Sequence, residues 1–160
     1  MRYLTIITTL LLMITLGCAN QDNTENGESS VESRFDQELA DQLGADDYGM
    51  RSYVMAILKA GPNTDQDEEE AMELQRGHMA NINRLAEEGV LVLAGPFSDG
   101  GEMRGIFIFD VETVEEAREL TESDPAVQAG RLAMELHPWY GSAALLQINE
   151  IHDTISKETP

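Results

Sequence analysis

The sequence predicts an α+β domain whose elements follow the order βαββαβ. A long amphipathic helical segment, residues 68–89, stands near the start of the domain. A segment of strand composition precedes it, and two more follow it before a second helical segment at 113–122. A last strand comes after that helix. Two helices that connect four strands in this order pack on one face of an antiparallel sheet, which is the ferredoxin-like fold.

The long helix, residues 68–89, is the clearest element. At about 100° per residue, its apolar residues gather on one side: Ala71, Met72, Leu74, Met79, Ile82, Leu85 and Ala86. Gly89 is a natural end for the helix. His78 falls among the apolar positions, so we expect its side chain to point inward. A titratable group placed there must find a partner or stay neutral.

Four short segments are rich in apolar residues and are typical of strands: residues 51–59, 90–94, 105–111 and 131–136. Turn residues separate them. Gly61-Pro62-Asn63 turns the chain into the long helix, and Gly95-Pro96 ends the second strand. A loop at 97–103 with Gly100-Gly101 at its tip leads to the third strand.

Helix signals follow the third strand. Thr113 is the expected N-cap of the second helix, with Glu116 at the reciprocal position of a capping box. Asp124-Pro125 opens a short helical turn that stops at Gly130. From Ala143 to about 156 we expect an extended strand and then a short C-terminal helix. Before the domain, residues 35–43 can form a short amphipathic helix that Gly44 ends.

The N-terminus predicts export. After Arg2 comes an apolar run at 4–16, which is too short to span a bilayer comfortably, and Cys18 follows directly. The placement of this cysteine resembles a bacterial lipoprotein signal, in which the chain is cut before the cysteine and acyl chains then hold the protein on a membrane. Thr15 and Leu16 depart from the usual residues of that signal. We therefore expect a membrane-anchored lipoprotein that faces the periplasm or the cell exterior.

These observations divide the chain into segments: a signal peptide at 1–17, an acidic tether with a short helix at 18–49, the domain at 50–148 and a tail at 149–160.

The formal net charge of −20, from 10 basic and 30 acidic residues, argues against nucleic-acid binding. One cysteine excludes an internal disulfide. The histidines stand in no ligand motif and no glycine-rich phosphate loop is present, so we expect neither a metal nor a cofactor.

His78 is the candidate general base or acid. The alternative is a core histidine satisfied by one hydrogen bond. Asp124, which directly precedes Pro125, can simply be the cap of the short helix that follows it.

Six further residues are candidates for substrate binding: Gly95, Pro96, Asp99, Arg104, His137 and Trp139. The glycine-proline pair can let a ligand approach the backbone closely, or can only turn the chain. The aspartate and the arginine flank the loop and can bind a carboxylate, or can form a solvated pair. The histidine and the tryptophan end the last strand, where the indole can line a pocket or pack in an interface.

An ordered set of motifs resembles the YciI-like (YCII-related) family across residues 50–145: Tyr53-Val54-Met55, Arg76-Gly77-His78-Met79, Ala94-Gly95-Pro96-Phe97, Gly105-Ile106-Phe107, Asp124-Pro125 with Gly130, and Glu135-Leu136-His137-Pro138-Trp139. The resemblance implies a dimeric α/β-barrel, with His78 and Asp124 paired in a cleft. Members of this family are mostly of unknown function, and some act as lyases or dehalogenases on small, ring-derived organic acids.

Two classes of function fit the sequence. One is a cofactor-independent lyase or isomerase that uses the histidine-aspartate pair on a small organic acid or lactone. The other is a non-catalytic, membrane-tethered module for ligand binding or assembly. In either class the sheet face opposite the helices needs a cover, and a second copy of the chain is the simplest one. We therefore predict a homodimer through this open face, which a charge at Ile108 or Ala133 would dissociate.

Overall fold

The computed structural model describes residues 34–158. The signal peptide, Cys18 and most of the predicted tether lie outside these residues. The elements from the N-terminus are α1 (Gln37–Gln42), β1 (Met50–Ala60), α2 (Glu68–Glu87), β2 (Leu91–Pro96), β3 (Met103–Phe109), α3 (Val114–Glu122), α4 (Pro125–Gln128), β4 (Leu132–Ser142), the 3-10 helix η2 (Ala143–Gln147) and α5 (Ile148–Ile155). Within the described part of the chain, no helix is both long and apolar enough to cross a membrane.

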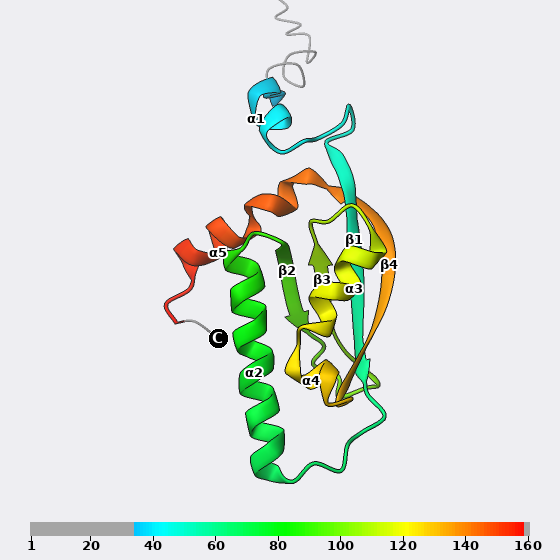
Figure 1. The fold of residues 1–160 in the computed structure, drawn as a ribbon. Coiled ribbons are helices and arrows are strands. Elements are labelled where there is room, and N and C mark those ends of the chain that lie inside the picture. Colours follow the sequence, from blue (N-terminus) through cyan, green and yellow to red (C-terminus); the bar gives the residue numbers. More distant parts are fainter. Residues whose placement is uncertain (1–33, 159–160) are drawn as a thin grey trace, which may run out of the picture. The chain divides into compact units, whose positions relative to one another are not determined.

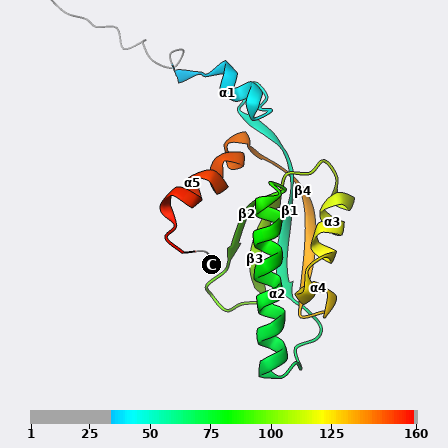
Figure 2. The ribbon, with the colours of Figure 1, turned by 60° about the vertical axis from the view of Figure 1, so that its left-hand side comes forward.

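The four strands form one sheet of order β2-β3-β1-β4, and all neighbours are antiparallel (Figure 1). This order confirms the ferredoxin-like subunit. Helix α2 packs over the β2 side of the sheet and α3 over the β4 side, with the short α4 between them (Figure 2). The predicted N-terminal helix is also present as α1, and Gly44 follows it with a positive φ of 59°.

Helix α2 begins and ends as its sequence predicts. The Asp67 side chain accepts a hydrogen bond from the Glu70 N–H, and three glutamates occupy the first turn, where the helix dipole favours negative charge. Gly89 follows the helix with φ 76°. The buried residues of α2 include His78 and Leu85, so His78 points inward as expected. Met72 does not, because the first turns of α2 extend past the sheet (Figure 1), and its side chain is exposed.

The helix-facing side of the sheet carries the main core. Val54, Ala56 and Leu58 of β1 alternate along the strand and lie beside Phe107 and Phe109 of β3. The helices cover these side chains with Leu85 of α2 and Ala117 of α3, among other residues. Alternate residues of a strand point to opposite faces, so the remaining positions of β1 face away from the helices.

The opposite face of the sheet is only partly bare. Tyr53, Val92 and Ile108 are buried there, and Leu145 and Leu146 of η2 pack against them. The expected extended strand after Ala143 is therefore wrong, because the chain turns into a 3-10 helix that covers one end of this face. Strand β4 is correspondingly longer than predicted and continues to Ser142.

Candidate functional site

A histidine-aspartate pair joins α2 to the start of α4. The His78 Nδ1 lies 2.6 Å from the Asp124 Oδ2, and the side chain of Asp124 is fully buried. The other carboxylate oxygen of Asp124 accepts a hydrogen bond of 2.8 Å from the Ala126 N–H, which caps α4. Asp124 therefore fills both of the roles that the sequence left open: it is a helix cap and the hydrogen-bond partner of His78.

This pairing fixes how His78 presents its ring. An ionised carboxylate only accepts hydrogen bonds, so Nδ1 is the nitrogen that carries the proton toward Asp124. In the neutral ring the lone pair is then on Nε2, and within residues 34–158 no hydrogen bond is made to that atom. The ring lies nearly parallel to that of Phe107, with 6.0 Å between centroids. Nε2 is thus a free proton acceptor on a ring that the hydrogen bond to Asp124 orients.

Gly77 brings the two halves of the pair together. A Cβ atom at this position would lie 3.0 Å from the Pro125 Cγ, closer than normal van der Waals contact. A glycine lets α2 approach α4 at this point. That close approach allows the neighbouring His78 to reach Asp124, which directly precedes Pro125.

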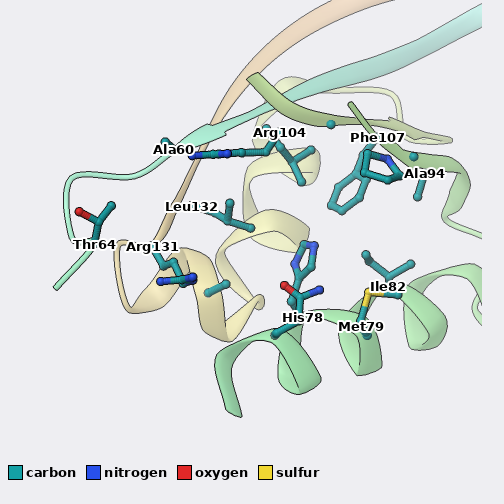
Figure 3. Close-up of a pocket in the computed structure, with 16 residues that line it drawn as sticks. Ala60, Thr64, His78, Met79, Ile82, Ala94, Arg104, Phe107, Arg131 and Leu132 are labelled. Carbon is teal, nitrogen blue, oxygen red and sulfur yellow. The ribbon is translucent and has the colours of Figure 1, made fainter. Parts of the chain in front are cut away.

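His78 opens onto a cavity of about 670 Å³ between α2, α4 and the sheet (Figure 3). Its apolar lining comes mainly from α2 and the strands: Leu58, Met79, Ile82, Ala94, Phe107 and Leu132. Its polar lining includes Thr64, Gln75, Arg104 and Arg131. No aspartate or glutamate of the described residues lines it, although the chain carries a net charge of −20. The cavity is therefore a locally cationic site in a strongly acidic protein.

Comparison with known proteins identifies the family. The model of the YCII-related domain matches residues 53–139. The chain belongs to the YCII-related domain family. An uncharacterized protein of Bacillus subtilis (strain 168), YjpA, is 32% identical over 90 residues, which cover 56% of this chain and 95% of that protein. A solved structure of 5-chloro-2-hydroxyhydroquinone dehydrochlorinase (TftG) from Burkholderia phenoliruptrix AC1100, in complex with 2,5-dihydroxybenzoquinone, covers 54% of this chain and 92% of its own, with 20% identity and a TM-score of 0.41.

Three of the six predicted binding residues line the cavity, and all three belong to the YCII-related domain. Gly95 and Pro96 line it from the end of β2, and Arg104 from β3. Asp99 lies outside it, because its carboxylate turns back to accept a 3.0 Å hydrogen bond from the Gly101 N–H in the loop. The structure therefore does not form the predicted pair between Asp99 and Arg104 for binding a carboxylate.

The other two predicted residues, His137 and Trp139, lie on the opposite face of the sheet. Trp139 stands across from Tyr53 on β1, with 5.8 Å between ring centroids. His137 Nε2 lies 3.0 Å from the Glu135 Oε1, and Glu135 also pairs with Lys59. Hydrogen bonds from Lys59 and then His137 hold the pKa of Glu135 below its ordinary value of 4.5. Strand alternation explains the placement: odd-numbered residues of β4 point away from α2 and its cavity.

Sequence reasoning missed one prominent cavity residue of the YCII-related domain, Arg131. It directly follows Gly130, whose φ of 69° turns the chain from α4 into β4. Its Nη1 donates a 3.0 Å hydrogen bond to the Gln66 Oε1. One feature of the sequence indicated a role for Arg131. Only 10 of the 160 residues are basic, and this one stands at the start of the predicted strand 131–136.

The donor set of the site is that of acid-base chemistry. Within residues 34–158, no group of three or more His, Cys, Asp or Glu side chains is arranged to hold a metal ion. The charged or titratable side chains that line the cavity are those of His78, Arg104 and Arg131. An imidazole can take or return a proton, and guanidinium groups bind carboxylates, often through two parallel hydrogen bonds.

Proposed function

We propose that the protein is a cofactor-independent lyase or isomerase that moves a proton on a small organic acid or lactone. The observation that carries this proposal is the His78–Asp124 pair, which presents a free Nε2 to a cavity lined by two arginines and no carboxylate of the described residues. His78 is the general base and then the general acid. Asp124 is a positioning residue, because it acts through His78 and does not face the cavity.

The two arginines supply the second part of the chemistry. Removal of a proton from carbon next to a carbonyl or carboxyl group leaves negative charge on its oxygens. Arg104 and Arg131 bind that group and stabilise the charge as it develops. The proton held on Nε2 then returns to another carbon in an isomerisation, or assists departure of a leaving group in an elimination. Phe107 and Met79 contact the apolar part of the substrate.

Hydrogen exchange tests this proposal even before the substrate is identified. A panel of small acids and lactones is incubated with the protein in D2O, and deuterium at carbon is detected by NMR. We expect exchange on at least one compound with the wild type and none above background with His78→Asn. Equal exchange with both proteins would contradict the proposal. Carboxylate binding without any exchange would favour the non-catalytic ligand-binding module instead.

We also propose a homodimer through the part of the open sheet face that η2 leaves uncovered. Ile57 and Ile106 pair across β1 and β3 on this face and remain half-buried. Exposed apolar surface of this kind needs a partner, and a second copy of the sheet supplies a matching one. Ile108 is less suitable for testing the interface than the sequence suggested, because it is already buried beneath η2.

Ile57→Asp is expected to convert the dimer to a monomer, because a carboxylate in the centre of an apolar interface would be desolvated without a partner. Light scattering coupled to gel filtration measures the change, and circular dichroism checks that the fold is kept. Ile151→Asp is the matched control, since Ile151 is exposed on α5. A dimer that survives both Ile57→Asp and Ile106→Asp would show that the sheets do not pack face to face.

A further inference from the structure

A second cavity lies directly beside the first. It has a volume of about 680 Å³ and lies between α2, β2 and α5. Ile82 of α2 and Ala94 of β2 line both cavities. Figure 3 shows these two side chains at the end of the first cavity that lies away from Arg131. The two cavities are therefore neighbours that share Ile82 and Ala94 as a common boundary.

Apolar and polar residues both line the second cavity. Its apolar lining includes Ala86, Leu91, Leu93 and Ile148. Its charged or titratable lining consists of Glu87, His152, Asp153, Lys157 and Glu158, mostly from α5 and the chain after it. Helix α5 is held in place where the Asn149 Nδ2 donates a 2.9 Å hydrogen bond to the Leu91 carbonyl oxygen. This helix follows the matched YCII-related segment, residues 53–139, so the second cavity uses a part of the chain beyond the family domain.

The lining residues of the first cavity are arranged in order along its length. Arg131 lies at one end of it, His78 rises from α2 in the middle, and Ile82 and Ala94 stand at the other end (Figure 3). Arg104 contributes a second guanidinium to the lining. A carboxylate bound by the arginines would thus direct the rest of its molecule past His78 and toward the shared boundary.

We propose that the two cavities form one elongated site for an amphipathic carboxylic acid, with its apolar tail passing between Ile82 and Ala94 into the cavity beneath α5. The inference rests on the proposed function for the position of the carboxylate and of the reacting carbon. It adds that this organic acid carries an apolar tail of several carbons. Ala94 gives the passage its width, because its side chain is a single methyl group.

Chain length provides the test. Binding of butanoate and decanoate to the full-length protein is measured by titration calorimetry, with decan-1-ol as the probe that lacks a carboxylate. Each buried methylene strengthens binding by about fourfold. Allowing for partial burial of the six additional methylenes, we expect decanoate to bind at least about a hundredfold more tightly than butanoate. Decan-1-ol should bind more weakly than decanoate.

Ala94→Trp should reduce the ratio of the two affinities to about tenfold or less, since an indole blocks the passage. Ala94 is exposed at the surface of the strand, so the larger ring can be accommodated. Ala86→Trp, which fills the second cavity from α2, should do the same. The matched control is Ala80→Trp, at an exposed position of α2 that lines neither cavity. It should keep the wild-type ratio.

Either of two results would overturn the inference. One is that Ala94→Trp and Ala86→Trp, both shown by circular dichroism to be folded, keep the wild-type ratio of the affinities for decanoate and butanoate. The other is that decanoate binds no better than butanoate to the wild type. Arg104→Ala separates this result from failure of the proposed function. This variant should weaken the binding of both acids by a similar factor and leave the binding of decan-1-ol unchanged. If Arg104→Ala leaves butanoate binding intact, the anion site is wrong, whereas the effect of Ala94→Trp on decan-1-ol still reports on the passage.

Discussion

Replacing His78 with alanine is expected to lower the free energy of unfolding by about 3–5 kcal/mol. The reason is the Asp124 carboxylate, which is fully buried and receives hydrogen bonds from only two groups of the described residues, the His78 ring and the Ala126 N–H. Without the imidazole, one oxygen of a buried charge has no donor. The loss of packing against Phe107 acts in the same direction. Urea denaturation followed by circular dichroism measures the change.

His78→Asn is the matched control for this stability loss. The asparagine amide nitrogen can occupy nearly the place of Nδ1 and donate to Asp124, so this variant should lose clearly less stability than His78→Ala. In a double-mutant cycle, His78→Ala combined with Asp124→Ala should cost less than the sum of the single changes, because each single change leaves one partner unsatisfied. Additive effects, or a His78→Ala cost below about 1 kcal/mol, would show that the hydrogen bond contributes little to the fold.

Asp124→Asn is expected to lower kcat by about 10²–10⁴-fold, the contribution typical of a general base. The amide keeps the cap of α4, because its oxygen can still accept from the Ala126 N–H. Its NH2 group donates where the carboxylate accepted, so the neutral His78 ring must offer a lone pair at Nδ1 and carry its proton on Nε2. Nε2 can then no longer accept a proton from the substrate.

The rate loss should fall on kcat and leave KM nearly unchanged, since the arginines that hold the carboxylate are not altered. The substrate is the compound that shows His78-dependent exchange in D2O. Asp99→Asn makes the same chemical change in the 97–103 loop, outside the cavity, and should keep wild-type activity. If Asp124→Asn keeps full kcat, or if the lost kcat is recovered when the fold is stabilised, the role of Asp124 is purely structural.

Structural features that depend on residues close together in the sequence were predictable from it. The capping box of α3 is one example: the Thr113 Oγ1 accepts from the Glu116 N–H at 3.2 Å, and the Glu116 carboxylate accepts from the Thr113 N–H at 3.0 Å. The length of α2 and the inward direction of His78 followed from helical spacing in the same way. The partner of His78 is 46 residues away, and only the family resemblance suggested it.

Features that depend on strand register were not predictable. Trp139 and His137 were candidates for a pocket, with packing or an interface as the alternative for Trp139. Strand β4 pairs with β1 so that Tyr53 stands opposite Trp139 and Met55 opposite His137, on the face away from α2. Composition could not assign these residues to a face without that register. The 3-10 helix η2 was missed for another reason. The prediction continued the strand past residue 143, although Ala, Leu and Gln favour a helix over a strand. The Ser142 hydroxyl, which accepts from the Ala144 N–H, starts the turn.

The most direct test of the proton-transfer site is the nitrogen NMR spectrum of the His78 ring, recorded with and without a small carboxylate such as butanoate. The site predicts that neutral His78 carries its proton on Nδ1, that Asp124→Asn moves the proton to Nε2, and that butanoate shifts the Nε2 resonance of the wild type. It also predicts that this shift is lost in Arg104→Ala. A ring protonated on Nε2 in the wild type, or an Nε2 resonance that saturating butanoate does not move, would contradict the assignment of His78 as the base of an anion-binding cavity.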